Sequence, residues 1–403
     1  MAGPGSALEV FVVSLRLGLT SFGGPIAHIG YQRRAFVETR GWLSDAAFAD
    51  LVALAQTLPG PASSQLSIAV GRLRAGWSGA LAAWLGFTLP SAIAMTLLGV
   101  WAVGTGIPTE GAVAGAVAGL KAAAVAVVAH AVLAMARRLT PDAPRVALAA
   151  AAALVMLAVQ AAWAQGAMIA LGALVGWVAW RGAGEGAGQA RGNAGRSALR
   201  AGGRRTALAL AFVVVVGGSQ AVALVTGDTT WDFTAAVVRA GALVFGGGHV
   251  VLPLLEAGVV APGFVTDEAF LAGYGAAQAV PGPLFTFASY LGAVSAAGPG
   301  GVAGAALATV AIFLPGALLV LAALPVLGAL AHRPGLAGAL RGVNAVVVGI
   351  LAAALVSPVG TSGITSPLSA AVAGLGTGAL LSGRVPPVVV VAAAAAVMAA
   401  AAA

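Results

Sequence analysis

Cysteine is absent from this chain of 403 residues, and its absence excludes disulfide bonds and thiolate metal sites. The four histidines are scattered, with no close pair at metal-ligand spacing. A phosphate-binding P-loop is also missing, so the chain alone is not expected to drive transport with ATP. The sequence contains neither the paired acids nor the activated nucleophile that would indicate an enzyme. We therefore expect a protein that is not an enzyme, holds no metal and needs no cofactor.

Charged residues are scarce as well. They make up 8% of the chain, whereas 60% of the residues are hydrophobic; soluble domains carry about 25% charged residues. A soluble protein could not keep so much apolar surface away from water. Because about 20 apolar residues span a bilayer, roughly thirteen hydrophobic segments predict an all-α polytopic protein of the inner cell membrane, with lipid as a partner. The 58 glycines suit a closely packed helix bundle.

The basic residues gather in a few loops. The net charge is +8, but no basic face with interleaved aromatic residues indicates nucleic-acid binding, so no nucleic-acid partner is expected. The Gly- and Ala-rich segment 181–205 holds six arginines, from Arg181 to Arg205, and is interpreted as a flexible cytoplasmic linker. The N-terminus lacks a basic region and carries Glu9, so no cleavable signal peptide is predicted.

The regions before and after this linker repeat one another. Arg16 followed by Phe22-Gly23-Gly24 recurs as Arg239 followed by Phe245-Gly246-Gly247. Further pairs keep one order at a nearly constant offset: Ser44-Asp45 with Thr266-Asp267, Phe48 with Phe270, Gln56-x-x-Pro59-Gly60-Pro61 with Gln278-x-x-Pro281-Gly282-Pro283, and Leu89-Pro90 with Leu314-Pro315. Internal duplication is common in secondary transporters. We predict an N-terminal repeat over 1–180, the linker over 181–205, a linking transmembrane helix over 206–230 and a C-terminal repeat over 231–403.

The arginines predict opposite orientations for the two repeats. If the linker lies inside, the loops that carry Arg72, Arg74, Arg137 and Arg138 also lie inside. The loops near 104–110 and 227–232 then fall outside, and both lack lysine and arginine. Since the seventh segment has no counterpart, the second repeat enters the membrane the other way up, so the repeat is inverted.

One loop does not fit an arrangement in which every segment spans the membrane. In that arrangement Arg33, Arg34 and Arg40 lie outside. They return inside if segments 8–27 and 46–70 are re-entrant broken helices, interrupted at Gly23-Gly24-Pro25 and Pro59-Gly60-Pro61. We favour these hairpins; full spans with a few misplaced arginines stay open, because the charge rule is statistical.

Several of these motifs resemble the chromate ion transporter family. The resemblance lies in Phe22–His28, Gly41–Asp45, Gln56–Gln65 and Trp84–Ser91, and in Phe245–Pro253 and Gln278–Pro283 of the second repeat. It covers nearly the whole chain and suits the family's long, two-domain form. It implies chromate efflux and chromate resistance, driven by the membrane potential or a proton gradient.

The substrate implied by this resemblance is chromate, a tetrahedral dianion. Sulfate has the same charge and nearly the same shape, so a transporter or exchanger of sulfate or another oxyanion stays the alternative. An uncoupled anion channel is a third hypothesis. Whether the chain forms a homodimer is also left open by the sequence.

Arg16 and Arg239 are the first candidates for binding an oxyanion. Each interrupts an apolar segment, where an arginine costs roughly 2.5–3.5 kcal/mol, and a guanidinium offers a planar fork of donors. Two such groups, one per repeat, would balance two negative charges. The alternative is that each snorkels to the interface or pairs structurally, with Glu9 and Asp232 near in sequence.

The two Pro-Gly-Pro motifs are the second candidate. A proline interrupts a helix, and the chain beyond it can begin a half-helix whose N–H groups favour an anion. A kink that only shapes packing is the alternative. The predicted binding residues of this group are Gln56, Pro59, Gly60, Pro61, Ser63 and Ser64 in the first repeat, and Gln278, Pro281, Gly282 and Pro283 in the second.

Four glycines and three other residues complete the candidates. Gly23, Gly24, Gly246 and Gly247 could expose backbone amides to the same anion or could serve close packing alone. Lys121, inside an apolar segment, either lines the path or makes a structural pair. His28 and Asp50 are the candidates for proton coupling.

Overall fold

The computed structural model describes residues 5–22, 24–106, 110–159, 162–180, 202–245, 248–326 and 334–403, and every regular element in these ranges is helical. Five of the helices are long and apolar enough to cross a membrane. The all-α fold class is therefore confirmed. Gly23, Gly246, Gly247 and residues 181–201 of the predicted linker lie outside the described residues. The linker's last four residues are helical, because α8 begins at Gly202.

The first repeat contains two short broken units (residues 7–39 and 45–74), one long helix (77–105) and an apolar arm (111–180); the corresponding arm of the second repeat covers 334–402. Its helices are α1 (Ala7–Thr20), α2 (Gly24–Arg33) continued by a π-helical turn (Arg34–Thr39), α3 (Asp45–Thr57), α4 (Ala62–Thr105), α5 (Gly111–Leu139), α6 (Ala143–Ala158) and α7 (Ala162–Trp180). Helix α4 is not continuous: Ala75 and Gly76 leave helical geometry, and the chain reverses there, because Gly71 and Gly79 lie against each other.

Helix α8 (Gly202–Thr226) leads into the second repeat. Its helices are α9 (Thr229–Leu243), α10 (Val251–Val259), α11 (Asp267–Ala279), α12 (Phe287–Val294), α13 (Gly301–Ala323), α15 (Pro334–Ala354), α16 (Thr361–Gly363), α17 (Pro367–Leu381) and α18 (Pro387–Ala402). Short 3-10 turns cover Gly248–Val250, Leu284–Thr286 and Leu324–Val326, and a π-helical turn covers Leu355–Gly360. The repeated Ser44 and Thr266 begin α3 and α11 in the same way, since each side chain accepts a hydrogen bond from the third N–H that follows.

The broken units of the first repeat are re-entrant hairpins. Both ends of the α1–α2 unit lie on one side, since Arg40 forms an ion pair with Glu9 at 3.8 Å. The α3–α4 unit returns to that side too, because the N–H of Gly5 donates to the carbonyl of Arg74 at 3.1 Å. The arrangement with full spans is therefore wrong for these segments. An exposed ion pair of this kind contributes little to stability, but it shows that the two ends of the unit lie close together.

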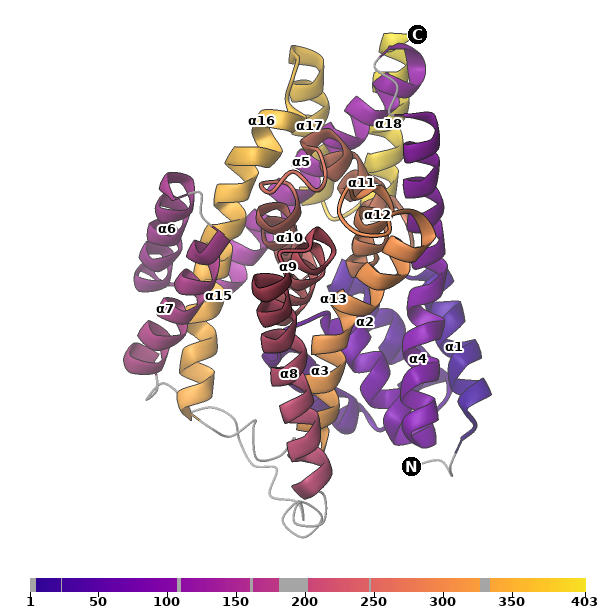
Figure 1. Ribbon diagram of the computed structural model, residues 1–403, viewed down its shortest axis with the longest axis vertical. Coiled ribbons are helices and arrows are strands. Elements are labelled where there is room, and N and C mark those ends of the chain that lie inside the picture. The colour runs from indigo at the N-terminus through magenta and orange to yellow at the C-terminus, as the bar shows by residue number, and fades with distance from the viewer. Residues whose placement is uncertain are drawn as a thin grey trace.

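The second repeat has the same arrangement at the other side of the molecule. The N–H of Ala296, after α12, donates to the carbonyl of Phe264, after α10, at 2.9 Å. Thr230, at the start of α9, lies against Gly298. Figure 1 shows α1, α2 and α3 in the lower part of the molecule and α10, α11 and α12 in the upper part. The two sets of hairpins thus enter from opposite sides.

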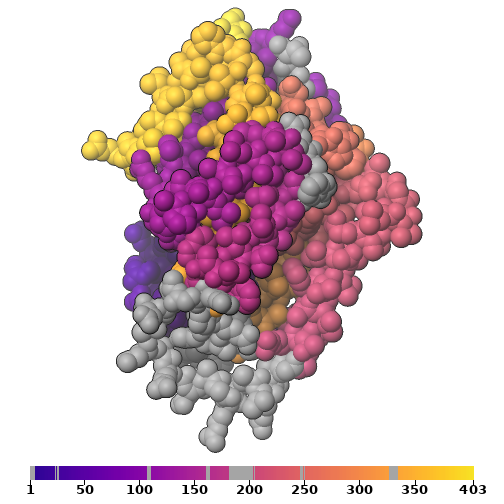
Figure 2. Space-filling model, turned by 90° about the vertical axis from the view of Figure 1, so that its left-hand side faces the viewer, coloured from indigo at the N-terminus to yellow at the C-terminus, as the bar shows by residue number. Residues whose placement is uncertain are grey.

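The apolar arm of each repeat packs on the arm of the other repeat. Helix α7 packs closely on α15, where Gly342 lies against Gly172 and Gly176. Helix α18 packs in the same way on α5, where Gly119 lies against Ala394. Figure 2 shows α6 and α7 (magenta) over the middle of this face, with orange residues of the second repeat behind them. Small residues allow such close approach of membrane helices.

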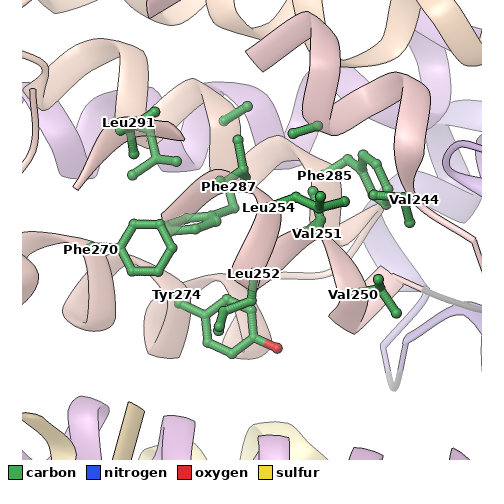
Figure 3. Packing of buried hydrophobic residues seen from close by; sticks show 14 of the residues in the cluster. Val244, Val250, Val251, Leu252, Leu254, Phe270, Tyr274, Phe285, Phe287 and Leu291 are labelled. Atoms are coloured by element: carbon green, nitrogen blue, oxygen red, sulfur yellow. The ribbon is translucent and has the colours of Figure 1, made fainter. Parts of the chain in front are cut away.

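A buried aromatic cluster holds the hairpins of the second repeat together. The rings of Phe270 and Phe287 lie 5.1 Å apart and those of Tyr274 and Phe287 lie 5.7 Å apart, both edge to face. Figure 3 shows these rings beside Leu252 and Leu254 of α10. Because lipid is as apolar as leucine, this cluster stabilises the fold through dispersion and ring geometry rather than through exclusion of water.

The hairpin topology predicts the sidedness of single cysteines placed in this cysteine-free chain. Thr39→Cys and Ser78→Cys, both exposed, should react with a membrane-impermeant maleimide from the cytoplasmic side of vesicles. Thr105→Cys, at the far end of α4, should react only from the opposite side. Labelling of Thr39→Cys and Ser78→Cys from opposite sides would contradict the hairpins.

Candidate functional site

Two backbone hydrogen bonds join the breaks of the four hairpin units. The N–H of Gly60 donates to the carbonyl of Val244 at 2.8 Å, and the N–H of Gly282 donates to the carbonyl of Ser21 at 2.9 Å. Gly60 and Gly282 are the central residues of the two Pro-Gly-Pro motifs, and Ser21 and Val244 each lie five residues after Arg16 and Arg239. Each bond therefore connects the second break of one repeat to the first break of the other. We call these two bonds, together with the four breaks that they connect, the junction.

The Pro-Gly-Pro motifs allow the close approach at the junction. Gly60 and Gly282 have φ values of 120° and 111°, a region that residues with a side chain rarely adopt. A Cβ atom on Gly60 would also lie 3.0 Å from the Cα of Gly316, and one on Gly282 would lie 2.7 Å from the Oγ of Ser91. Ser91 and Gly316 directly follow the repeated Pro90 and Pro315, inside the long helices α4 and α13.

Side chains of the first repeat fix its two hairpins to each other. The amide of Gln65 donates to the carbonyls of Pro59 at 2.8 Å and Gly316 at 3.2 Å. Gln32 on α2 donates to the carbonyl of Ser63 and to the hydroxyl of Ser67, both at 2.9 Å. The buried ring of His28 lies 3.4 Å from the hydroxyl of Ser63. Ser63 and His28 thus contribute to the contact between α2 and α4.

Several buried polar atoms around the junction have no hydrogen-bond partner among the described residues. They are the hydroxyls of Ser21, Ser64 and Thr88 and the amide nitrogen of Gln278. Ser21 forms the first break, Ser64 lies in the first turn after the second break, and Gln278 precedes the break at Pro281. Thr88 lies beside Ser91, whose hydroxyl donates to its carbonyl at 3.1 Å. A buried donor without a partner costs about 1–3 kcal/mol, so this group is suited to a polar ligand.

Known proteins resemble the chain over both repeats. A family model described as chromate transporter matches residues 8–177 and 231–399. The chain belongs to the chromate transporter family. A chromate transport protein of Pseudomonas aeruginosa is 30% identical over 87% of this chain and 80% of its own length. A chromate transport protein of Cupriavidus metallidurans is 28% identical over 86% of this chain and 81% of its own length. A probable chromate transport protein of Synechococcus elongatus is 28% identical over 85% of this chain and 82% of its own length. No solved structure matches.

In this member of the chromate transporter family neither predicted arginine takes part in the two junction bonds. Arg239 donates from Nη1 to the Oε1 of Gln220 on α8 at 3.0 Å, and the amide of Gln220 donates to the carbonyl of Ala235. Arg16 is exposed on the same stripe of α1 as Leu8, Val12 and Leu19. The opposite face of α1, with Gly18, packs on α4 near Phe87. A role for either arginine in binding stays a prediction.

The other predicted residues divide between the junction and exposed surfaces. Pro59, Pro61, Pro281 and Pro283 flank the two junction glycines, and Gly24 begins α2 with a φ of 77°. Gln56 is exposed on α3, whereas the repeat-related Gln278 is half-buried. Asp50 is exposed on the same helix. Gly23, Gly246 and Gly247 lie outside the described residues.

Four residues of this site were not predicted from the sequence. Gln65, Thr88 and Ser91 lie in stretches that carry the family resemblance, but none of the four, Ser21 included, was assigned a role. Single hydroxyl or amide residues in apolar segments have many structural roles. A signal for two of them was present, because the repeated Leu89-Pro90 and Leu314-Pro315 mark the helix turns that meet the junction. Proximity between these turns and the Pro-Gly-Pro motifs depends on packing between repeats, which spacing alone does not reveal.

The two repeats differ in how their matching helices are covered. Ala49, Asp50 and Ala53 on α3 are exposed, whereas the repeat-related Leu271, Ala272 and Gly275 on α11 are buried. Helix α11 packs on α5, where Gly275 lies against the carbonyl of Leu120. The structure is therefore asymmetric: one Pro-Gly-Pro hairpin is sealed by its neighbouring arm and the other has a free face.

Proposed function

We propose that this protein is a secondary active transporter that exports chromate, or a tetrahedral dianion of the same class, across the inner cell membrane. The junction carries this proposal, because it collects buried donors that have no partner among the described residues, between two inverted repeats. Inverted transporters commonly bind substrate at the interface of their repeats, at interrupted helices. The names of the relatives supply the substrate class, and the membrane potential or a proton gradient is the proposed driving force.

The chemistry of the junction suits an anion that has lost its water. Ser64 lies in the first turn of α4, where free N–H groups and the helix dipole favour negative charge. The hydroxyls of Ser21 and Thr88 and the amide of Gln278 can donate to further oxygens of the same anion. Desolvation of a dianion is costly, and hydrogen bonds to charged groups contribute about 1.5–3 kcal/mol each. Several donors together can therefore offset much of this cost.

We propose that the free face of α3 forms the cytoplasmic route to the junction. Asp50 and Gln56 give this face polar groups, which lipid would disfavour. Its repeat-related counterpart on α11 is sealed against α5, so the present conformation would be open to the cytoplasm and closed to the other side. If α3 became covered and α11 exposed, the junction would open to the other side of the membrane and release the anion there. Asp50, in contact with this route, and His28, beside Ser63, remain the proposed proton carriers.

This proposed opening predicts a difference between two alanines. Ala53→Cys on α3 should react readily with a small hydrophilic thiol reagent added from the cytoplasmic side. Ala272→Cys on α11, buried at 6% exposure, should stay protected in the same preparation. Equal reactivity of the two cysteines in the resting protein would contradict an opening on one side.

Flux measurements test the function itself. Inside-out vesicles that contain the wild-type protein should accumulate chromate when a proton gradient and membrane potential are imposed, and should do so less without them. Ser64→Ala should lower chromate flux by about 10-fold or more, because a donor to a charged acceptor is lost. Ser78→Ala, an exposed serine in the turn of α4, is the matched control and should transport normally.

Three outcomes of that experiment would count against the proposal. Wild-type vesicles that carry neither chromate nor sulfate would contradict transport of a tetrahedral dianion. Chromate flux that does not depend on the imposed proton gradient or membrane potential would indicate an uncoupled channel. Normal flux through Ser64→Ala and Gln278→Leu together would remove the junction as the binding site, while leaving the transport activity in place.

A further inference from the structure

The chain has one lysine among its 20 basic residues, and this lysine lies inside a membrane helix. Lys121 is ten residues after the start of α5 and is half-buried. No hydrogen bond or ion pair of its ammonium group occurs within the described part of the chain. A lysine at such a depth costs roughly 2.5–3.5 kcal/mol on insertion scales. A cation kept there is therefore expected to serve a ligand or a partner.

The packing of α5 places Lys121 beside the end of α11. The preceding residue, Leu120, presents its carbonyl to Gly275 of α11. Leu120 and Ala279, the last residue of α11, pack against the same small cluster around Ala123. The last turn of α11 also carries Gln278, whose buried amide nitrogen has no hydrogen-bond partner in the part of the chain that the structure describes. Lys121 thus lies next to the helical turn that leads directly into the break at Pro281.

The other flank of Lys121 is formed by a break in the second arm. Its carbonyl lies 3.0 Å from the Cβ position of Gly363, the last residue of the short helix α16 that follows the interrupted segment 355–360. The backbone of Lys121 therefore lies between two interrupted segments of the second repeat. Backbone interruptions at membrane depth are tolerated where they are buried in protein or line a polar path.

The position of Lys121 carries a charge in the first repeat but not at the matching position of the second repeat. Gly115-x-x-x-Gly119-Leu-Lys121 of α5 matches Gly338-x-x-x-Gly342-Val-Asn344 of α15. The match is structural too, since Gly119 packs on α18 as Gly342 packs on α7. The fold therefore accepts a neutral polar residue at this position, in Asn344. A lysine at the matching position is not required by the packing.

We propose that Lys121 supplies the fixed positive charge of the oxyanion site and so determines its preference for dianions. This proposal rests on the proposed function. The ammonium group sits on a flexible four-carbon chain with three donors, and it can reach past the end of α11 towards Gln278 and the break at Pro281. In this proposal Lys121 takes the role first expected of Arg16, which is exposed, and of Arg239, which is bonded to Gln220 of α8.

The test is anion binding to the purified full-length protein in detergent, with sodium chromate and sodium sulfate as titrants in calorimetry. Lys121→Met removes the charge but keeps the length, and it should weaken chromate binding by about 30-fold or more, which corresponds to about 2 kcal/mol at 1.4 kcal/mol per tenfold change. Lys121→Arg should retain most of the binding. Arg138→Met removes a charge from the exposed end of the same helix and should bind within about threefold of the wild type.

A second variant and a second measurement separate binding from folding. Lys121→Asn introduces the residue that the other arm already carries at 344, so it should fold even if the methionine variant does not, and should lose binding equally. Chromate should raise the thermal midpoint of the wild type but not of Lys121→Asn, while the midpoints without anion stay similar. Wild-type affinity in Lys121→Asn would overturn the proposal. A wild-type protein that binds neither anion would instead overturn the proposed function.

Discussion

The structure depends on a crossed pair of backbone hydrogen bonds, from Gly60 to Val244 and from Gly282 to Ser21. Each bond ties the second break of one repeat to the first break of the other, so neither repeat can form its centre alone. In a low-dielectric interior these bonds are strong, and an unpaired N–H or carbonyl would be costly. Four interrupted helices can therefore end inside the membrane because each provides the partner that another lacks.

This constraint also explains why polar atoms remain unpaired nearby. The junction bonds satisfy two N–H groups and two carbonyls. The hydroxyls of Ser21, Ser64 and Thr88 and the amide nitrogen of Gln278 have no partner among the residues that the structure describes. These groups lie between the repeats, where a change in the packing of α3 and α11 would alter access to them. The same four backbone breaks thus place these donors between the repeats and allow access to them to change from one side of the membrane to the other.

The sequence predicted the features that follow from local chemistry. Proline and glycine act on their own backbone, so the breaks at Pro59–Pro61 and Pro281–Pro283 and the re-entrant hairpins could be predicted from position and charge. The exposure of each face of a half-helix could not be predicted, because it depends on which neighbour covers that face. Helix α8 covers Arg239 through Gln220, whereas Arg16 is exposed. The packing of α7 on α15 and of α18 on α5 could not be predicted either, since α18 is apolar on every side and Gln165 is the one polar side chain of α7.

The central claim is that a tetrahedral dianion binds at the junction, and the most direct measurement is its position in a structure. Crystals or grids prepared with tungstate, a heavy anion of the same shape and charge, would show it by anomalous scattering or strong density. The account predicts one site between Gly60 and Gly282, within hydrogen-bond distance of Ser64 or Gln278 and within reach of Lys121. A site at Arg16 or Arg239, with the junction empty under saturating anion, would contradict it.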